Sequence, residues 1–116
     1  MTRRRVWAKR VAAVWLAVAT VGAAIAEPRL FDLAIQNGRL PENRRLVRVR
    51  QGEDVILKWT ADRAVVLHLH GYDIEAKVSP ATPTEMRFTA TATGRFPIEL
   101  HTETHATIGH LEVHPR

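Results

Sequence analysis

The stretch that decides the fold runs from Thr93 to Pro115 and reads Thr-Gly-Arg-Phe-Pro-Ile-Glu-Leu-His-Thr-Glu-Thr-His-Ala-Thr-Ile-Gly-His-Leu-Glu-Val-His-Pro. Its first part alternates apolar Phe96, Ile98 and Leu100 with residues of other kinds, which is the period-two pattern of a strand buried on one face. After a short polar segment, the alternation resumes with Leu-Glu-Val. We therefore predict two strands joined by a loop, with four of the chain's six histidines in or beside that loop.

Short alternating segments of the same kind fill the earlier part of the chain. Turn-forming residues such as Asn37-Gly38 separate them at intervals of roughly ten residues, the spacing typical of all-β domains. No segment of useful length repeats apolar residues with the three-and-four spacing of a helix. The predicted fold class is therefore all-β, an antiparallel Greek-key β-sandwich or barrel. The strands are predicted at residues 30–35, 46–50, 55–59, 65–70, 72–78, 86–89, 95–101 and 111–113.

The first 26 residues have the three parts of a secretory signal peptide. A basic start, with Arg3-Arg4-Arg5, is followed by an uncharged run at residues 11–25 and by an Ala-x-Ala cleavage site that ends at Ala26. The run is shorter than the ~20 apolar residues that span a membrane, so cleavage after Ala26 is favoured over an uncleaved anchor. We predict a signal peptide at residues 1–26 and one periplasmic or secreted domain at residues 27–116. Sec and twin-arginine export both remain open.

The charge balance changes once this signal is removed. The formal net charge is +5, from 17 Lys and Arg against 12 Asp and Glu. Five of the basic residues and none of the acidic ones precede residue 27, so the predicted mature domain carries twelve of each. A domain without excess positive charge gives no support to nucleic-acid binding. The chain also has no cysteine, so the exported domain must be stable without disulfide bonds.

Several motifs together cover most of the predicted mature chain. Residues 47–59, Val-Arg-Val-Arg-Gln-Gly-Glu-Asp-Val-Ile-Leu-Lys-Trp, are similar to the strand, glycine turn and strand of the cupredoxin family. A strand ending in His68 follows, where the family places its first copper-ligand histidine. Residues 78–100, with their proline loop and Gly94-Arg95-Phe96, are similar to the run that leads to the family's last ligand loop. The resemblance covers residues 30–114 and implies a cupredoxin-like β-sandwich.

The resemblance does not extend to the blue-copper site. In the family that site takes a cysteine thiolate, a histidine and a methionine from the end of the chain. Here Leu100 occupies the cysteine position, and Thr107 or Ile108 the methionine position, while His105 matches the histidine. A soft trigonal copper site cannot form without the thiolate. The resemblance therefore implies the fold and two histidine ligands, His68 and His105, but not blue-copper electron transfer.

Five histidines are candidate metal ligands. His68 and His70 lie two residues apart in a strand and share one face, which points away from the core if the neighbouring leucines point inward. In the resembling fold this strand end lies beside the last loop. We therefore predict a cluster at one end of the sandwich, formed by His68, His70, His101, His105 and His110. Asp73 and Glu103 are candidate oxygen ligands or orienting residues, and His114 is expected to be exposed to solvent.

Neutral imidazoles suit Cu(II), Zn(II) or Ni(II). The sequence therefore predicts an exported cupredoxin-like domain, residues 27–116, that binds or buffers a divalent metal ion, copper first and zinc as the alternative. If the histidines are only a solvent-exposed face, the domain is instead a metal-free interaction module of a membrane or periplasmic complex. We predict no enzymatic activity, because Ser79 is the only serine and lies in a proline loop without a nucleophile elbow. The expected partners are a metal ion and a protein, and not nucleic acid.

Overall fold

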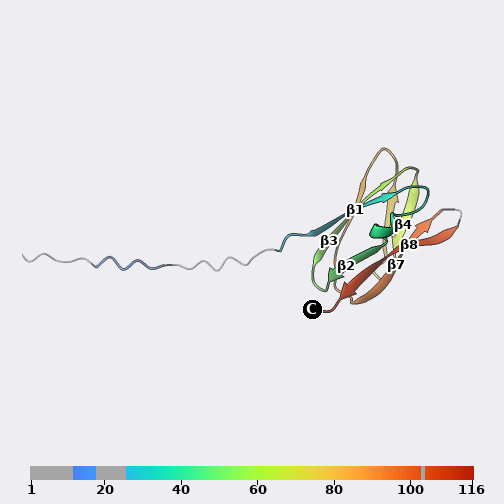
Figure 1. The fold of residues 1–116 in the computed structure, drawn as a ribbon. Helices are drawn as coiled ribbons and strands as arrows, with labels where there is room; N and C mark the ends of the chain where they lie inside the picture. Colours follow the sequence, from blue (N-terminus) through green and yellow to red (C-terminus); the bar gives the residue numbers. More distant parts are fainter. Residues whose placement is uncertain (1–11, 18–25, 103) are drawn as a thin grey trace, which may run out of the picture.

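The computed structural model describes residues 12–17, 26–102 and 104–116. The predicted signal peptide lies mostly outside these residues, of which 12–17 are exposed and have no regular secondary structure. No helix in the described part of the chain is long and apolar enough to cross a membrane. The domain consists of strands and one short 3-10 helix (Figure 1), namely β1 (Arg29–Ile35), η1 (Glu42–Arg44), β2 (Leu46–Arg50), β3 (Asp54–Ala61), β4 (Val65–Leu69), β5 (Ile74–Val78), β6 (Thr84–Thr89), β7 (Gly94–His101) and β8 (His105–His114).

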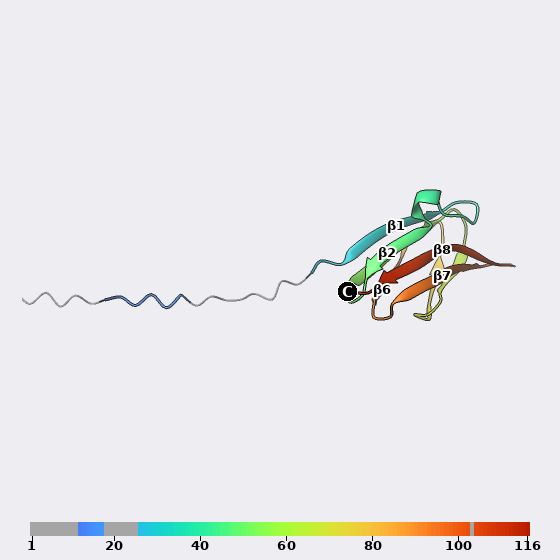
Figure 2. The same ribbon diagram turned by 60° about the horizontal axis from the view of Figure 1, so that its bottom comes forward.

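The strands form two sheets that pack around one hydrophobic core (Figures 1 and 2). The three-stranded sheet has the order β1-β3-β6, and the five-stranded sheet has the order β2-β8-β7-β4-β5. The predicted all-β sandwich is confirmed. Two pairs differ from the antiparallel expectation, because β1 runs parallel to β3 and β2 runs parallel to β8. Alternation along a strand identifies its two faces, but it does not identify the neighbouring strand or its direction.

Every second residue of the central strands points into this core. On β4, Leu67 and Leu69 are fully buried, whereas His68 between them is partly exposed. On β7, Ile98 and Leu100 are buried in the same way. The predicted inward face of the closing strand is thus confirmed. The polar residues of both strands lie on the opposite, outer face of the five-stranded sheet.

Strand β8 contains one residue more than the part of β7 with which it pairs. Ile98 pairs with Gly109. The next residue of β7, Glu99, pairs with Thr107, which leaves Ile108 as the extra residue. This is a β-bulge, and it reverses the faces of all the residues on one side of it.

The bulge decides which way His105 points. In an unbroken strand, His105 and Leu111 would have the same parity and would both face the core. With the extra residue between them, His105 lies on the outer face, opposite His101. Because β8 begins at His105, both His105 and His110 lie on a strand. The prediction that these histidines lie in a loop is therefore wrong, since His101 ends β7 and β8 begins at His105.

Candidate metal centre

The candidate site lies on the outer face of the five-stranded sheet, across β4, β7 and β8. His68 of β4 is paired with Glu99 of β7. His101 of β7 is paired with His105 of β8. Side chains directly opposite each other in antiparallel strands have Cβ atoms about 5 Å apart. The strand register therefore brings polar side chains from three strands into one cluster.

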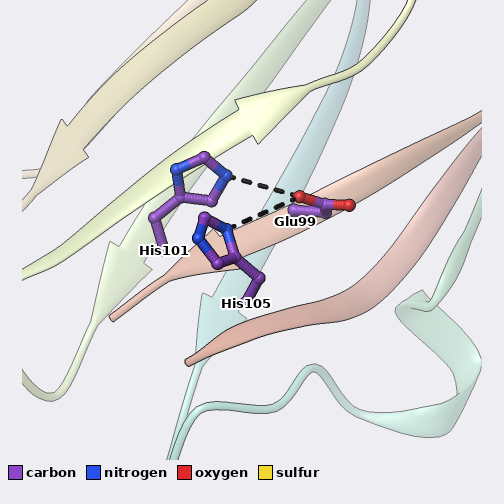
Figure 3. A group of neighbouring side chains, drawn as sticks. All are labelled: Glu99, His101 and His105. Atoms are coloured by element: carbon purple, nitrogen blue, oxygen red, sulfur yellow. Dashed lines mark ion pairs between the residues drawn. The ribbon is translucent and has the colours of Figure 1, made fainter. Parts of the chain in front are cut away.

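Glu99 is the centre of this cluster. Its Oε2 lies 2.9 Å from Nε2 of His70, 3.4 Å from Nε2 of His101 and 4.0 Å from Nδ1 of His105. Figure 3 shows the rings of His101 and His105 beside the carboxylate, to which both are joined by ion-pair contacts. The ligand atoms of Glu99, His101 and His105 all lie within 4.8 Å of one another. Such a group is compact enough to surround one metal ion.

The surrounding imidazoles keep Glu99 in its charged form. The hydrogen bond from His70 is the main cause that lowers the pKa of Glu99 from its usual value of 4.5. Burial of the carboxylate is the second-largest effect and raises this pKa, while the charge of His70 and the proximity of His101 lower it further. Glu99 is therefore an ionised carboxylate at neutral pH, which is the form that binds cations.

His101 contributes a nitrogen that the protein itself does not satisfy. Its Nε2 is 3.4 Å from Oε2 of Glu99, but the contact lacks hydrogen-bond geometry. This buried nitrogen has no hydrogen-bond partner among the residues that the structure describes. An unpaired buried polar atom costs about 1–3 kcal/mol. A cation held between His101 and Glu99 removes that cost, so the residues present fit a divalent ion with nitrogen and oxygen ligands.

His68 and His70 form the β4 side of the cluster. Nδ1 of His68 lies 3.4 Å from Nε2 of His70. The other ring nitrogen of His68, Nε2, lies 3.1 Å from Oδ1 of Asp73 in the turn after β4. The ring centroids of His68 and His101 are 5.7 Å apart, and those of His101 and His105 are 4.5 Å apart. The imidazoles thus form a continuous row across the three strands.

The structure brings together four of the five histidines proposed as ligands, namely His68, His70, His101 and His105. His110 also lies on the outer face, but it is not part of the cluster. It pairs with Pro97 of β7, whose carbonyl oxygen accepts a hydrogen bond from the backbone of His70, so Pro97 lies between His110 and His70. The cluster lies on the sheet face beside the β7–β8 hairpin, and not between strand ends and a loop at one end of the sandwich. The reason is that His68 points outward from β4, and His70, in the turn directly after β4, lies beside it against Glu99.

The other candidates of the sequence analysis are placed as follows. Asp73 is part of the cluster through its contact with His68. Glu103 lies outside the described residues. His114 is outside the cluster, with 51% of its side chain exposed, and pairs with Glu112.

Glu99 is the residue that the sequence analysis missed. A signal was present, because Glu99 precedes His101 by two residues in a predicted strand and so shares its face. The sequence did not indicate that His70, in the turn directly after β4, lies against the same carboxylate. That contact depends on which strand pairs with β7.

The donor set does not fit a blue-copper site. Leu100, at the position where the resemblance places the thiolate, points into the core and is 5% exposed. The chain has no cysteine to replace it. The cluster offers imidazole nitrogens and carboxylate oxygens, which are harder ligands than a thiolate.

No protein-family model and no curated protein sequence matches the chain. Solved structures do match it. One, from a heme-copper terminal oxidase dimer, is 16% identical, with a TM-score of 0.60 and 73% of this chain covered. A copper binding protein in the apo form is 10% identical over 77% of this chain, with a TM-score of 0.56 and 92% of its own chain covered. The periplasmic domain of subunit II of cytochrome oxidase from Bradyrhizobium japonicum is 11% identical over 76% of this chain, with a TM-score of 0.57 and 83% of its own chain covered.

The chain is shorter than several of the chains it matches. It spans 64% of the terminal oxidase chain, and 42% and 40% of two copper oxidase chains. At such low sequence identities the similarity establishes the architecture alone. Two sheets in the observed order, together with these matches, show that the chain adopts the cupredoxin-like fold and carries a candidate Glu/His/His metal site on it.

Proposed function

We propose that this protein binds a divalent metal ion, copper first, on the outer face of its five-stranded sheet, and so buffers or carries that ion. The observation that supports this most directly is the group of Glu99, His101 and His105, whose ligand atoms lie within 4.8 Å of one another. Mixed imidazole and carboxylate ligands suit Cu(II), and Zn(II) is the alternative. The similarity to a copper binding protein supports copper.

The proposed location is the periplasm or the extracellular space. Two features support it: the signal-peptide pattern of residues 1–26, and the similarity to a domain described as periplasmic. The proposal assigns no catalytic role. The only serine, Ser79, lies at the turn between β5 and β6, outside the histidine cluster.

Cu(II) or Zn(II) should raise the melting temperature of the untagged protein, because an ion bound only by the folded state stabilises that state by mass action. At a hundredfold excess over the dissociation constant, the stabilisation is about 2.7 kcal/mol, which corresponds to roughly 10 °C or more for a domain of this size. Melting curves followed by circular dichroism at about pH 7.5, where free imidazoles are neutral, measure the shift.

Variants decide whether the shift comes from the cluster. The double variant His101→Ala/His105→Ala should show a clearly smaller shift, whereas His114→Ala should keep the full shift, because His114 lies outside the cluster. Lowering the pH below about 6.5 should weaken the shift, since protons compete with the ion for imidazole nitrogens. An unchanged wild-type melting curve with both ions contradicts metal binding.

A copper-loaded sample should show only weak d–d absorption. The intense charge-transfer band of blue-copper proteins, near about 600 nm, requires a Cu–thiolate bond. Leu100 stands at the thiolate position and the chain has no cysteine. Visible absorption spectroscopy of the copper-loaded protein measures this, and a deep blue colour would show that the ligand set is different.

The second candidate function is a metal-free interaction module of a membrane or periplasmic complex. One observation favours it: this fold covers 83% of a domain that belongs to a cytochrome oxidase subunit. This function predicts no metal-dependent change in melting temperature for the wild-type protein or any histidine variant. The thermal measurement above therefore distinguishes the two.

A further inference from the structure

We propose that the outer face holds two adjoining cation positions that share Glu99. The first lies between Glu99, His101 and His105. The second lies between Glu99, His68 and His70, and Asp73 positions His68 for it. This inference rests on the proposed function, and it specifies how many ions the cluster takes and through which atoms.

The known distances separate the two positions. The compact group of mutually close ligand atoms contains Glu99, His101 and His105 and leaves out His68 of β4 and His70 in the turn after it. Yet His70 Nε2 is the nitrogen nearest to Oε2 of Glu99, at 2.9 Å. Two donors bonded to one ion at about 2.0–2.1 Å are at most about 4.2 Å apart. Oε2 of Glu99 thus belongs to a compact group with His101 and His105, and it also has a separate close nitrogen, Nε2 of His70.

The β4 side has the spacing that a second ion needs. Nδ1 of His68 and Nε2 of His70 are 3.4 Å apart. Around a tetrahedral ion with nitrogen ligands at about 2.0–2.1 Å, neighbouring nitrogens are separated by about 3.3–3.4 Å. The two imidazoles therefore need little movement to bind the same ion. Oε2 of Glu99, 2.9 Å from His70, is the third donor, and His68 must move toward this oxygen, because the three ligand atoms do not all lie within 4.8 Å of one another.

The hydrogen bonds at His68 direct the lone pair of its Nδ1 toward His70. Nε2 of His68, 3.1 Å from Oδ1 of Asp73, is the nitrogen that donates to this carboxylate. The lone pair of neutral His68 is then on Nδ1, the atom that faces His70. A carboxylate that holds the distal nitrogen of an imidazole is the usual arrangement behind a metal-bound histidine. In the metal-free protein, His70 Nε2–H faces both His68 Nδ1 and Glu99, and the ion replaces that proton.

The turn after β4 holds Asp73 where His68 can reach it. Gly71 has a φ of +82°, and a Cβ at this position would overlap the ring of Phe96. Asp73 itself has a φ of +52°, a left-handed conformation that aspartate tolerates better than most residues. Between them, Tyr72 donates a 2.7 Å hydrogen bond to the carbonyl oxygen of Ala92. The turn is therefore anchored by the residues directly before Asp73.

Counting the bound ions tests the proposal. Equilibrium dialysis of the untagged wild-type protein against Cu(II), followed by metal analysis, should give two ions per chain. His105→Ala and His70→Ala should each retain one ion, through opposite halves of the cluster. His114→Ala should retain two. The two Cu(II) ions should also couple magnetically through Glu99, so the wild-type paramagnetic resonance signal should account for less copper than is bound, and each single variant should recover the full signal.

The possible failures are distinct. A wild-type protein that binds one ion, and loses it in His105→Ala but not in His70→Ala, overturns the second position and leaves the proposed function in place. One ion lost in both variants shows a single composite site and also overturns the inference. A wild-type protein that binds no ion overturns the proposed function itself.

Asp73 has its own test as a positioning residue. Asp73→Gly removes the carboxylate but keeps a residue that accepts the left-handed φ. It should weaken the binding affinity for the second ion by about 10–100-fold and leave the affinity for the first ion unchanged. Asp73→Asn should largely restore binding, because its amide oxygen accepts the same hydrogen bond. If Asp73→Gly lowers the binding affinity for both ions equally, or for neither, the result contradicts this role.

Discussion

Replacing Trp59 by alanine should lower the free energy of unfolding by about 3–5 kcal/mol. Trp59 lies on β3, the central strand of the three-stranded sheet, and its side chain is fully buried. Its removal takes the largest buried side chain out of the core and leaves a cavity. Since small domains are stable by only about 5–15 kcal/mol, the loss is a large fraction of the total. Guanidinium unfolding followed by far-ultraviolet circular dichroism measures it.

Trp59→Phe is the matched control. Nε1 of Trp59 is buried and has no hydrogen-bond partner within the described part of the chain. Phenylalanine keeps an aromatic ring and removes this unsatisfied donor, whose burial costs about 1–3 kcal/mol. The phenylalanine variant should therefore lose clearly less stability than the alanine variant. If Trp59→Ala costs under about 1 kcal/mol, the side chain does not fill the core as described.

Leu100→Ala should cost about 2–5 kcal/mol, the range for removing a leucine from a close-packed core. Leu100 lies on the inner face of β7, where it pairs with Leu67 of β4 and Ala106 of β8. The comparison is Arg95→Ala on the same strand, where the side chain is exposed. That change should stay within about 1 kcal/mol.

The comparison of these two variants also tests the register of β7. A slip of one residue moves every side chain of a strand to the other face. If Leu100→Ala is nearly neutral, then Glu99 and His101 face the core, and the proposed metal centre cannot form on the outer surface. Chemical unfolding of both variants under the same conditions therefore bears on the site as well as on stability.

The sequence by itself determined the strands and most of their faces. The alternation at residues 65–70 predicted that Leu67 and Leu69 point inward and that His68 points outward, as the structure shows, although β4 ends at Leu69 and His70 lies in the turn after it. The same alternation placed Leu100 in the core. These properties are local, because a strand shows its two faces in the spacing of its own residues. The resemblance to the cupredoxins likewise predicted the fold that the structure has.

Only the tertiary structure decided which histidines meet. The pairing of β4 with β7 sets His68 opposite Glu99 and brings His70, in the turn after β4, against the same carboxylate, and nothing within either strand indicates that pairing. The extra residue Ile108 turns His105 to the outer face, although alternation from the end of β8 places it toward the core. Strand pairing and bulges arise from contacts between residues far apart in the chain. The sequence therefore predicted a group of histidines, whereas the fold selected four of them and added a carboxylate at their centre.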